Sequence, residues 1–253
     1  MTSPQVAQYI AGGKDAIIIP VGSCEQHGPH CPLGTDTFIT QETAIRIGRL
    51  LGMIVAPPVA AGVSDQHLRW PGTISLRGET VHLIIRDHLE SLIPHGFRTF
   101  ILFFFHTKNK IPIDAAAWEL KRRLGPKIKV LVVNAFAAWQ SCAPAIFGSD
   151  SGIDPLWLSH GGEGETACMQ HLGFSIDPKQ MPERFAPSDF IERSRSPEVY
   201  EIIQDLATYA PGGVWGEPRK SSAALGERIF ETVSNRLAGL ISKRLQPESE
   251  SEH

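Results

Sequence analysis

Apolar and polar residues follow one another along the chain in blocks that predict strands and helices in alternation. Four short, continuous apolar runs are typical of strands buried on both faces of a parallel sheet, and they span residues 16–21, 53–59, 99–105 and 129–134. Other segments repeat apolar residues three or four positions apart, as one face of a helix requires, and they span residues 36–51, 80–93, 113–124, 162–172 and 225–245. This alternation predicts an α/β fold with a mostly parallel central sheet.

The remaining segments lack a regular pattern. Residues 173–214 are polar and rich in proline, so we expect an irregular excursion over the surface. No internal repeat or linker divides the sequence, which favours a single domain over residues 1–245. The tail, residues 246–253, is acidic and rich in serine, and we expect it to be disordered.

Composition excludes several classes of protein. Of the 253 residues, 42% are apolar and 20% are charged, which is typical of a globular chain. A formal net charge of −3 gives no electrostatic reason to expect a nucleic-acid partner, and no apolar run approaches the ~20 residues of a membrane span. Residues 1–11 do not resemble a signal peptide, and the four cysteines form no CxxC pair. We therefore expect a cytoplasmic protein with reduced thiols and without nucleic-acid or membrane partners.

Ionisable residues concentrate in the loop that follows the first predicted strand. Glu25 and His27 are two positions apart, so in an extended segment their side chains project to the same side and can meet one metal ion. Asp36 opens the next predicted helix, where a helix-capping acid is the alternative to a ligand. Beside the Glu-x-His pair, a ligand is the preferred interpretation. Carboxylate and imidazole ligands together suit Zn²⁺ or Mn²⁺.

Two further segments bring candidate chemistry to the same edge of the predicted sheet. His106 directly follows the run 99–105, and in α/β sheets functional residues gather at the carboxyl ends of the strands. The segment HGGEGE contains His160, Glu163 and Glu165, and its glycines allow the backbone to approach a crowded centre. The two glutamates are either first-turn acids that interact with a helix dipole or, with His160, a ligand and a proton carrier.

Four segments of the chain resemble the creatininase (creatinine amidohydrolase) family. The stretch PVGSCEQHGPH at residues 20–30, followed by Thr35-Asp36, is similar to the first motif of that family. The other three segments are WPGTISL at residues 70–76, HGGEGET at residues 160–166 and GVWGEP at residues 213–218. The resemblance extends over about residues 6–245. It implies a three-layer α/β/α domain with a two-metal site.

The resemblance also implies roles for individual residues. Glu25, His27 and Asp36 match metal ligands of the family, with Asp36 bridging the two ions. His106 matches a further ligand histidine. His160 matches the histidine proposed to carry the proton in creatininase.

The sequence departs from the family pattern at one ligand position. Where the family has Asn-Gly-His-Gly-Gly-Asn, residues 104–109 read FFHTKN. The family places a carboxylate either two residues after the ligand histidine or in the HGGE turn. The first position is Lys108 here, so the ligand role is assigned to Glu163, with Glu165 as the second choice and as a catalytic candidate. The charge of Lys108 either weakens the second metal site or binds an anionic group of the substrate.

A second departure concerns the substrate. Creatininase has a tryptophan four residues before its proton-carrying histidine, whereas here Leu156 holds that position and Trp157 follows it. This difference weakens the case for creatinine as the substrate. Trp157 and Lys108 are substrate-binding candidates, and His67 is a third, with a position on the surface as its alternative.

Together with these residues, the resemblance implies a metal-dependent amidohydrolase. Two Zn²⁺ or Mn²⁺ ions, with Fe²⁺ also possible as the metal, would activate a hydroxide. The hydroxide attacks the carbonyl carbon of a cyclic amide or another non-peptide amide in a small molecule, and the C–N bond is cleaved. One alternative keeps the metal site but cleaves a formamide, a cyclic ketone sugar or a short peptide. Another is a non-catalytic binding protein with a degraded site. The resemblance further implies a homohexamer.

Overall fold

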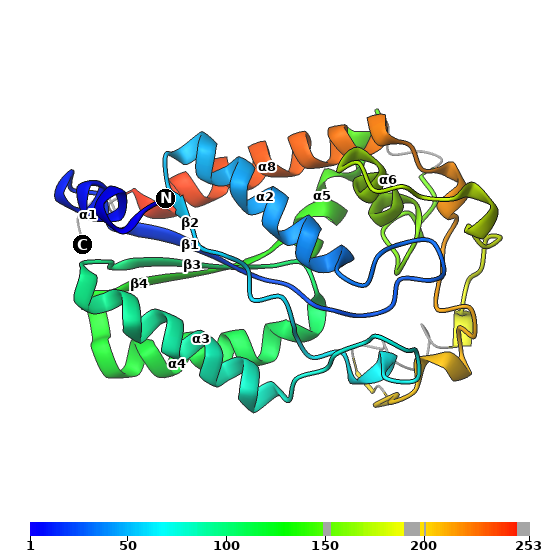
Figure 1. The fold of residues 1–253 in the computed structure, drawn as a ribbon, viewed down its shortest axis with the longest axis horizontal. Coiled ribbons are helices and arrows are strands. Elements are labelled where there is room, and N and C mark those ends of the chain that lie inside the picture. Colours follow the sequence, from blue (N-terminus) through cyan, green and yellow to red (C-terminus); the bar gives the residue numbers. More distant parts are fainter. Residues whose placement is uncertain (149–152, 190–197, 200, 247–253) are drawn as a thin grey trace.

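A four-stranded parallel sheet forms the middle layer of the molecule (Figure 1). In spatial order its strands are β2 (Ile54–Val55), β1 (Ala16–Val21), β3 (Thr99–Phe104) and β4 (Lys129–Asn134). All pairings in this sheet are parallel. The structure is a computed structural model that describes residues 1–148, 153–189, 198–199 and 201–246. Apart from Gln246, the tail predicted to be disordered therefore lies outside the described residues.

Helices lie on both sides of the sheet, which confirms the predicted three-layer α/β/α class (Figure 1). One layer contains α2 (Thr35–Leu51), α5 (Ala135–Phe147), α6 (Glu163–His171) and α8 (Ala223–Leu245). The other contains α3 (Gly78–Leu92) and α4 (Lys110–Leu124), with α1 (Ser3–Ala11) packed against the same core.

Side-chain alternation along β3 separates two apolar cores. Ile101 and Phe103 face the layer of α2, α5 and α8, whereas Phe100, Leu102 and Phe104 face α3 and α4. All five side chains are fully buried. A strand that is apolar on both faces is stable only between two covering layers, which explains why this run lies inside the sheet rather than at its edge.

Two helices and one strand differ from the sequence-based expectation. The sequence pattern did not reveal α1 or α5. Helix α5 is apolar over most of its length and begins where the Asn134 side chain accepts a hydrogen bond from Ala137 N (3.1 Å). The strand predicted over residues 53–59 is shortened to Ile54–Val55, because Pro57 and Pro58 cannot donate hydrogen bonds to β1.

The described part of residues 173–214 is irregular, as predicted. Leu206 and Trp215 pack with Trp70 in a small apolar cluster, and Arg69 pairs with Asp205 (3.0 Å). This segment therefore covers the loop that contains η1. The short 3-10 helices among the described residues are η1 (Asp65–His67), η2 (Ile93–His95), η3 (Thr107–Asn109), η4 (Gly125–Lys127), η5 (Pro178–Gln180), η6 (Leu206–Thr208) and η7 (Pro218–Lys220).

The structure also bears on the cysteines and on membrane-spanning segments. Cys24, Cys31, Cys142 and Cys168 are all free thiols. Among the described residues, every helix is too short or too polar to cross a bilayer.

The double-sided burial of β3 predicts a large effect of a cavity there. Ile101→Ala removes buried methyl groups from a fully covered position and is expected to lower the free energy of unfolding by about 2–5 kcal/mol. The matched control Ile111→Ala changes a side chain that is 79% exposed and is expected to shift it by less than about 0.5 kcal/mol. Equilibrium denaturation with urea measures both; equal losses would contradict the assigned packing.

Candidate metal centre

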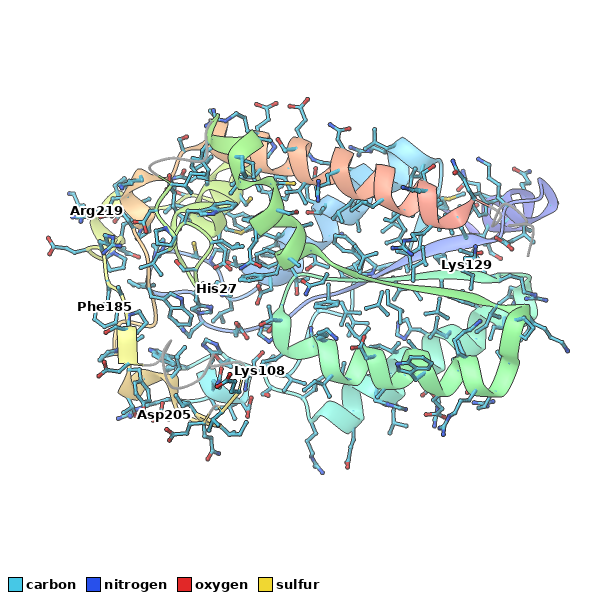
Figure 2. The ribbon with its side chains drawn as sticks, turned by 180° about the vertical axis from the view of Figure 1, so that it is seen from behind. His27, Lys108, Lys129, Phe185, Asp205 and Arg219 are labelled. Carbon is cyan, nitrogen blue, oxygen red and sulfur yellow. The ribbon has the colours of Figure 1, made fainter. Side chains whose placement is uncertain are left out.

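Seven ionisable side chains from five parts of the chain meet beyond the carboxyl ends of β1 and β3. They are Glu25, His27, Asp36, His67, His106, His160 and Glu165. Figure 2 shows His27 at this end of the molecule, together with Lys108, whereas Lys129 at the start of β4 lies at the opposite end. The parallel sheet brings these segments together, because all its strands end at one edge.

Buried polar side chains hold the surrounding loops in place. Asn109 donates to Gly22 O (2.8 Å) and accepts from Val63 N (3.1 Å), so it ties three loops to one another. Thr37 donates to Ser23 O (2.8 Å), and His30 contacts Gly161 O (3.2 Å) at the start of α6. The ionisable groups are therefore held in position by hydrogen bonds between the surrounding loops rather than by contacts with one another.

A cavity of about 350 Å³ opens onto the cluster. Glu25, Asp36, His106 and Glu165 line it, and other lining side chains include Lys108 and Trp215. A larger hollow of about 830 Å³ lies near β2, is lined mainly by apolar side chains, and contains none of the seven clustered residues. Of these two, only the smaller cavity is therefore lined by the clustered ionisable groups.

Two histidines present a lone pair to the carboxylates. His27 Nδ1 donates to Glu25 O (3.1 Å), and His106 Nε2 donates to Val63 O (2.7 Å). In the neutral form that binds a metal ion, an imidazole has one N–H, so these outer hydrogen bonds leave the lone pair on the inner nitrogen. His27 Nε2 lies 3.4 Å from a Glu165 oxygen, and His106 Nδ1 lies 3.2 Å from Asp36 Oδ2. An outer N–H bound to a carbonyl is the arrangement that orients a metal-ligating histidine.

The same space holds three buried carboxylates: Glu25, Asp36 and Glu165 are at most 4% exposed. Burial raises the pKa of Glu25, and it raises that of Glu165 to about 7. Burial lowers the pKa of His106, but the carboxylates of Glu25 and Asp36 outweigh it and raise this pKa to about 10. Concentrated negative charge in a buried space requires a proton or a cation.

Two unpartnered atoms show that the residues fit a divalent metal ion. His27 Nε2 and Asp36 Oδ2 are buried and make no hydrogen bond to any described residue. Glu25, His27 and Asp36 can together place one ligand atom each within 4.8 Å of one another, and so can His27, His160 and Glu165. Oxygen and imidazole donors of this kind suit Zn²⁺ and Mn²⁺.

The structure separates the two glutamates at the start of α6. Glu165 accepts from Gly161 N (2.7 Å) and faces His27. Glu163 belongs to none of the three possible metal-binding groups among the described residues, and the charges that act on it are those of Lys220, Asp154 and Glu217. Positions two apart on a helix point about 200° apart, so only one of the pair can face the cavity. The clustered groups therefore include Glu165, the second choice, and not Glu163.

The substrate-binding candidates have different positions. Lys108 lies at the rim of the cavity, where its Nζ pairs with Asp65 Oδ1 (2.9 Å), and it is not among the clustered ligand atoms. Trp157 instead stacks on Trp139 (ring centroids 5.8 Å apart) inside the apolar core and is not among the residues that line the cavity. His67 is buried beside Glu25 (3.5 Å) rather than on the surface.

Two residues of the site were missed from the sequence. Trp215 lines the cavity and lies against the His160 ring (5.1 Å between centroids), and its place in the GVWGEP segment was the available signal. Gln26 lies between Glu25 and His27 and is 4% exposed. Its place inside the PVGSCEQHGPH motif was the available signal.

The chain is similar over most of its length to several known proteins. The family model described as "Creatininase: Creatinine amidohydrolase" matches residues 1–241. The "Mycofactocin precursor peptide peptidase" of Mycolicibacterium smegmatis is 31% identical over 241 residues, which cover 92% of this chain and 86% of that protein. The "Creatinine amidohydrolase" of Pseudomonas putida is 27% identical over 260 residues, with 98% and 96% covered. A solved structure described as "Creatininase Mn" has the same fold, with a TM-score of 0.81, 23% identity, and 98% and 97% covered.

The positions of the two glutamates predict that only one of them affects metal binding. Glu165→Gln removes the charge of a candidate ligand that faces His27 and is expected to lower the affinity for Zn²⁺ at least about tenfold. Glu163→Gln is the matched control on the same helical turn and is expected to leave this affinity unchanged. Competition with a chromophoric chelator measures both, and the reverse order would assign the ligand to Glu163.

Proposed function

The chain belongs to the creatininase family, and from that premise we propose that it is a metal-dependent amidohydrolase that cleaves a non-peptide C–N bond in a small amide or cyclic amide. One observation carries the proposal: buried carboxylates and histidine lone pairs converge in the cavity with two of their atoms unpartnered. Such a set of groups is stable when a divalent cation binds among them.

Five side chains are proposed to hold two metal ions: Glu25, His27, Asp36, His106 and Glu165. Asp36 could contribute to both ions, because its Oδ1 faces His27 (3.8 Å) and its Oδ2 faces His106 (3.2 Å). When bound, Zn²⁺ or Mn²⁺ ions supply an activated water and a Lewis acid for the carbonyl oxygen, and Fe²⁺ is compatible with the same ligands.

His160 is proposed to hold and return the proton. Its Nε2 donates to Gln26 O (2.6 Å), so the unprotonated Nδ1 points toward the cavity, 3.7 Å from Glu25 Oε1. A proton accepted at Nδ1 lies in the cavity, from which it can pass to the leaving nitrogen of a substrate bound there. Trp215 stacks against the ring and limits the access of water on that side.

A second candidate substrate is a short peptide. The similarity to the mycofactocin precursor peptide peptidase supports it. Lys108 at the rim also supports it, because its ammonium group can bind a free carboxylate as part of a substrate. We propose that Lys108 binds an anionic group in either case.

We further propose that residues 1–245 act as one domain, that the protein is cytoplasmic, and that it forms a homo-oligomer, a hexamer by family resemblance. The free thiols support the location. The edge strand β4 supports association, because Val132 (38% exposed) and the neighbouring Trp118 (72% exposed) leave apolar surface uncovered. Light scattering coupled to size exclusion measures the number of subunits.

Metal dependence tests the proposed activity. Protein stripped with a chelator is expected to be inactive, and Zn²⁺ or Mn²⁺ is expected to restore hydrolysis of at least one member of a panel of cyclic amides, formamides and short peptides with and without a free carboxylate. Released amine measures turnover. No turnover with any metal would favour the binding protein with a degraded site.

The rim position of Lys108 predicts an effect on substrate binding rather than on chemistry. Lys108→Met is expected to raise KM for carboxylate-bearing substrates about tenfold with little change in kcat, since hydrogen bonds to charged groups are worth about 1.5–3 kcal/mol. Lys110→Met is the matched control, because Lys110 pairs with Asp114 on the surface of α4. A fall in kcat alone would contradict this role for Lys108.

A further inference from the structure

We infer that His67 is a hydrogen-bond donor to the substrate carbonyl oxygen rather than a metal ligand, and that Gln26 is the positioning residue that keeps its N–H in the cavity. This inference deepens the proposed hydrolase function and rests on it for the role of the donor. The assignment of the N–H itself rests on hydrogen bonds around the buried Gln26 amide.

The orientation of the Gln26 amide is fixed by two backbone groups. Gly28 N donates to Gln26 Oε1 (2.9 Å), and Gln26 Nε2 donates to Gly213 O (3.0 Å). An N–H can face only the amide oxygen, and a carbonyl can face only the amide nitrogen. The two ends of the side chain therefore cannot be exchanged.

Gln26 Nε2 has two hydrogens and three neighbours within hydrogen-bond distance. These neighbours are Gly213 O, His67 Nδ1 (2.9 Å) and His160 Nε2 (2.9 Å). His160 Nε2 already donates its hydrogen to the backbone carbonyl oxygen of Gln26 (2.6 Å), because a carbonyl can only accept. His160 Nε2 therefore has no lone pair with which to accept from the Gln26 amide. The two amide hydrogens therefore go to Gly213 O and to His67 Nδ1.

His67 is the opposite tautomer of the ligand histidines. Since His67 Nδ1 accepts from Gln26, its ring hydrogen is on Nε2, which faces Glu25 Oε1 (3.5 Å) in the cavity lining. His27 and His106 donate on their outer side and present a lone pair inside. A nitrogen that holds a hydrogen cannot bind a metal ion, so the possible group of Glu25, His67 and His160 is not a metal site in this hydrogen-bonded arrangement.

The backbone is shaped around this amide. Gly213 has a φ of +71°, and a Cβ atom there would lie 2.1 Å from Gln26 Oε1. Gly28, which donates to the same oxygen, has a φ of +73°. Glycine is required at both positions, by its left-handed backbone and, at Gly213, by the contact distance. A fixed N–H is useful where negative charge develops on a carbonyl oxygen, because it requires no reorganisation during the reaction.

Nuclear magnetic resonance of protein with ¹⁵N-labelled histidine reads the tautomer directly. We expect long-range ¹H–¹⁵N spectra of the metal-free and Zn²⁺-loaded protein to show His67 with hydrogen on Nε2; the His67→Gln spectrum assigns the signals. Gln26→Glu offers oxygens only and is expected to move the hydrogen to Nδ1. Hydrogen on Nδ1 in the unaltered protein, or coordination of Nε2 by Zn²⁺, would overturn the inference.

Kinetics and metal content test the role. His67→Gln is expected to lower kcat about 10²–10³-fold with little change in KM and with unchanged Zn²⁺ content. Gln26→Met, which removes the amide without adding charge, is expected to lower kcat at unchanged Zn²⁺ content. His95→Gln, at an exposed position in η2, is the control and is expected to change neither. Loss of Zn²⁺ from His67→Gln would make His67 a ligand and overturn the inference.

The two proposals fail in different ways. The tautomer is measured without substrate, so an Nε2–H on His67 in a protein that hydrolyses nothing would contradict the proposed function and leave the hydrogen assignment standing. Metal-dependent hydrolysis by a protein with Nδ1–H on His67 would contradict this inference alone. Circular dichroism and thermal unfolding show whether each variant is folded. If Gln26→Glu does not fold, the spectrum of the unaltered protein still decides the tautomer of His67.

Discussion

The mutual repulsion of buried carboxylates is the constraint on which this structure depends. Glu25, Asp36 and Glu165 lie in one small space, and the histidines beside them, His27 and His106, turn lone pairs toward them. Burying charge in this way is unfavourable unless an opposite charge enters. The energy must come from the rest of the fold, whose two apolar cores and tied loops keep the groups from separating. The site is therefore organised for a cation before one binds.

The parallel sheet brings these groups together. Its strands end together, so residues more than 100 positions apart in the chain, such as His27 and Glu165, become neighbours at 3.4 Å. Parallel strands need long crossover connections, and those connections are the helices that cover the sheet. The loops at the carboxyl edge are then free to differ in sequence, provided that tethers such as Asn109 and His30 hold them.

Identical side chains acquire different chemistry in this cavity from the atoms behind them. His106 is held by the carbonyl of Val63, so its inner nitrogen accepts; His67 is held by the amide of Gln26, so its inner nitrogen donates. Sequence motifs record which residue is present but not which nitrogen has the hydrogen. A tertiary contact decides that. Here the contact is made by Gln26, the residue between Glu25 and His27.

The sequence alone determined the class of fold and most of the helices and strands, because apolar runs and helical periodicity reflect burial directly. It also brought Glu25, His27, Asp36 and His106 forward as one group, through spacing, strand ends and a family resemblance. Tertiary structure decided the rest. Whether Glu163 or Glu165 faces the cavity depends on the rotation of α6, and a tryptophan becomes core or cavity wall according to what packs on it. The orientation of α6 and the packing of the tryptophans depend on contacts between segments far apart in the chain. Local sequence patterns contain no information about such contacts.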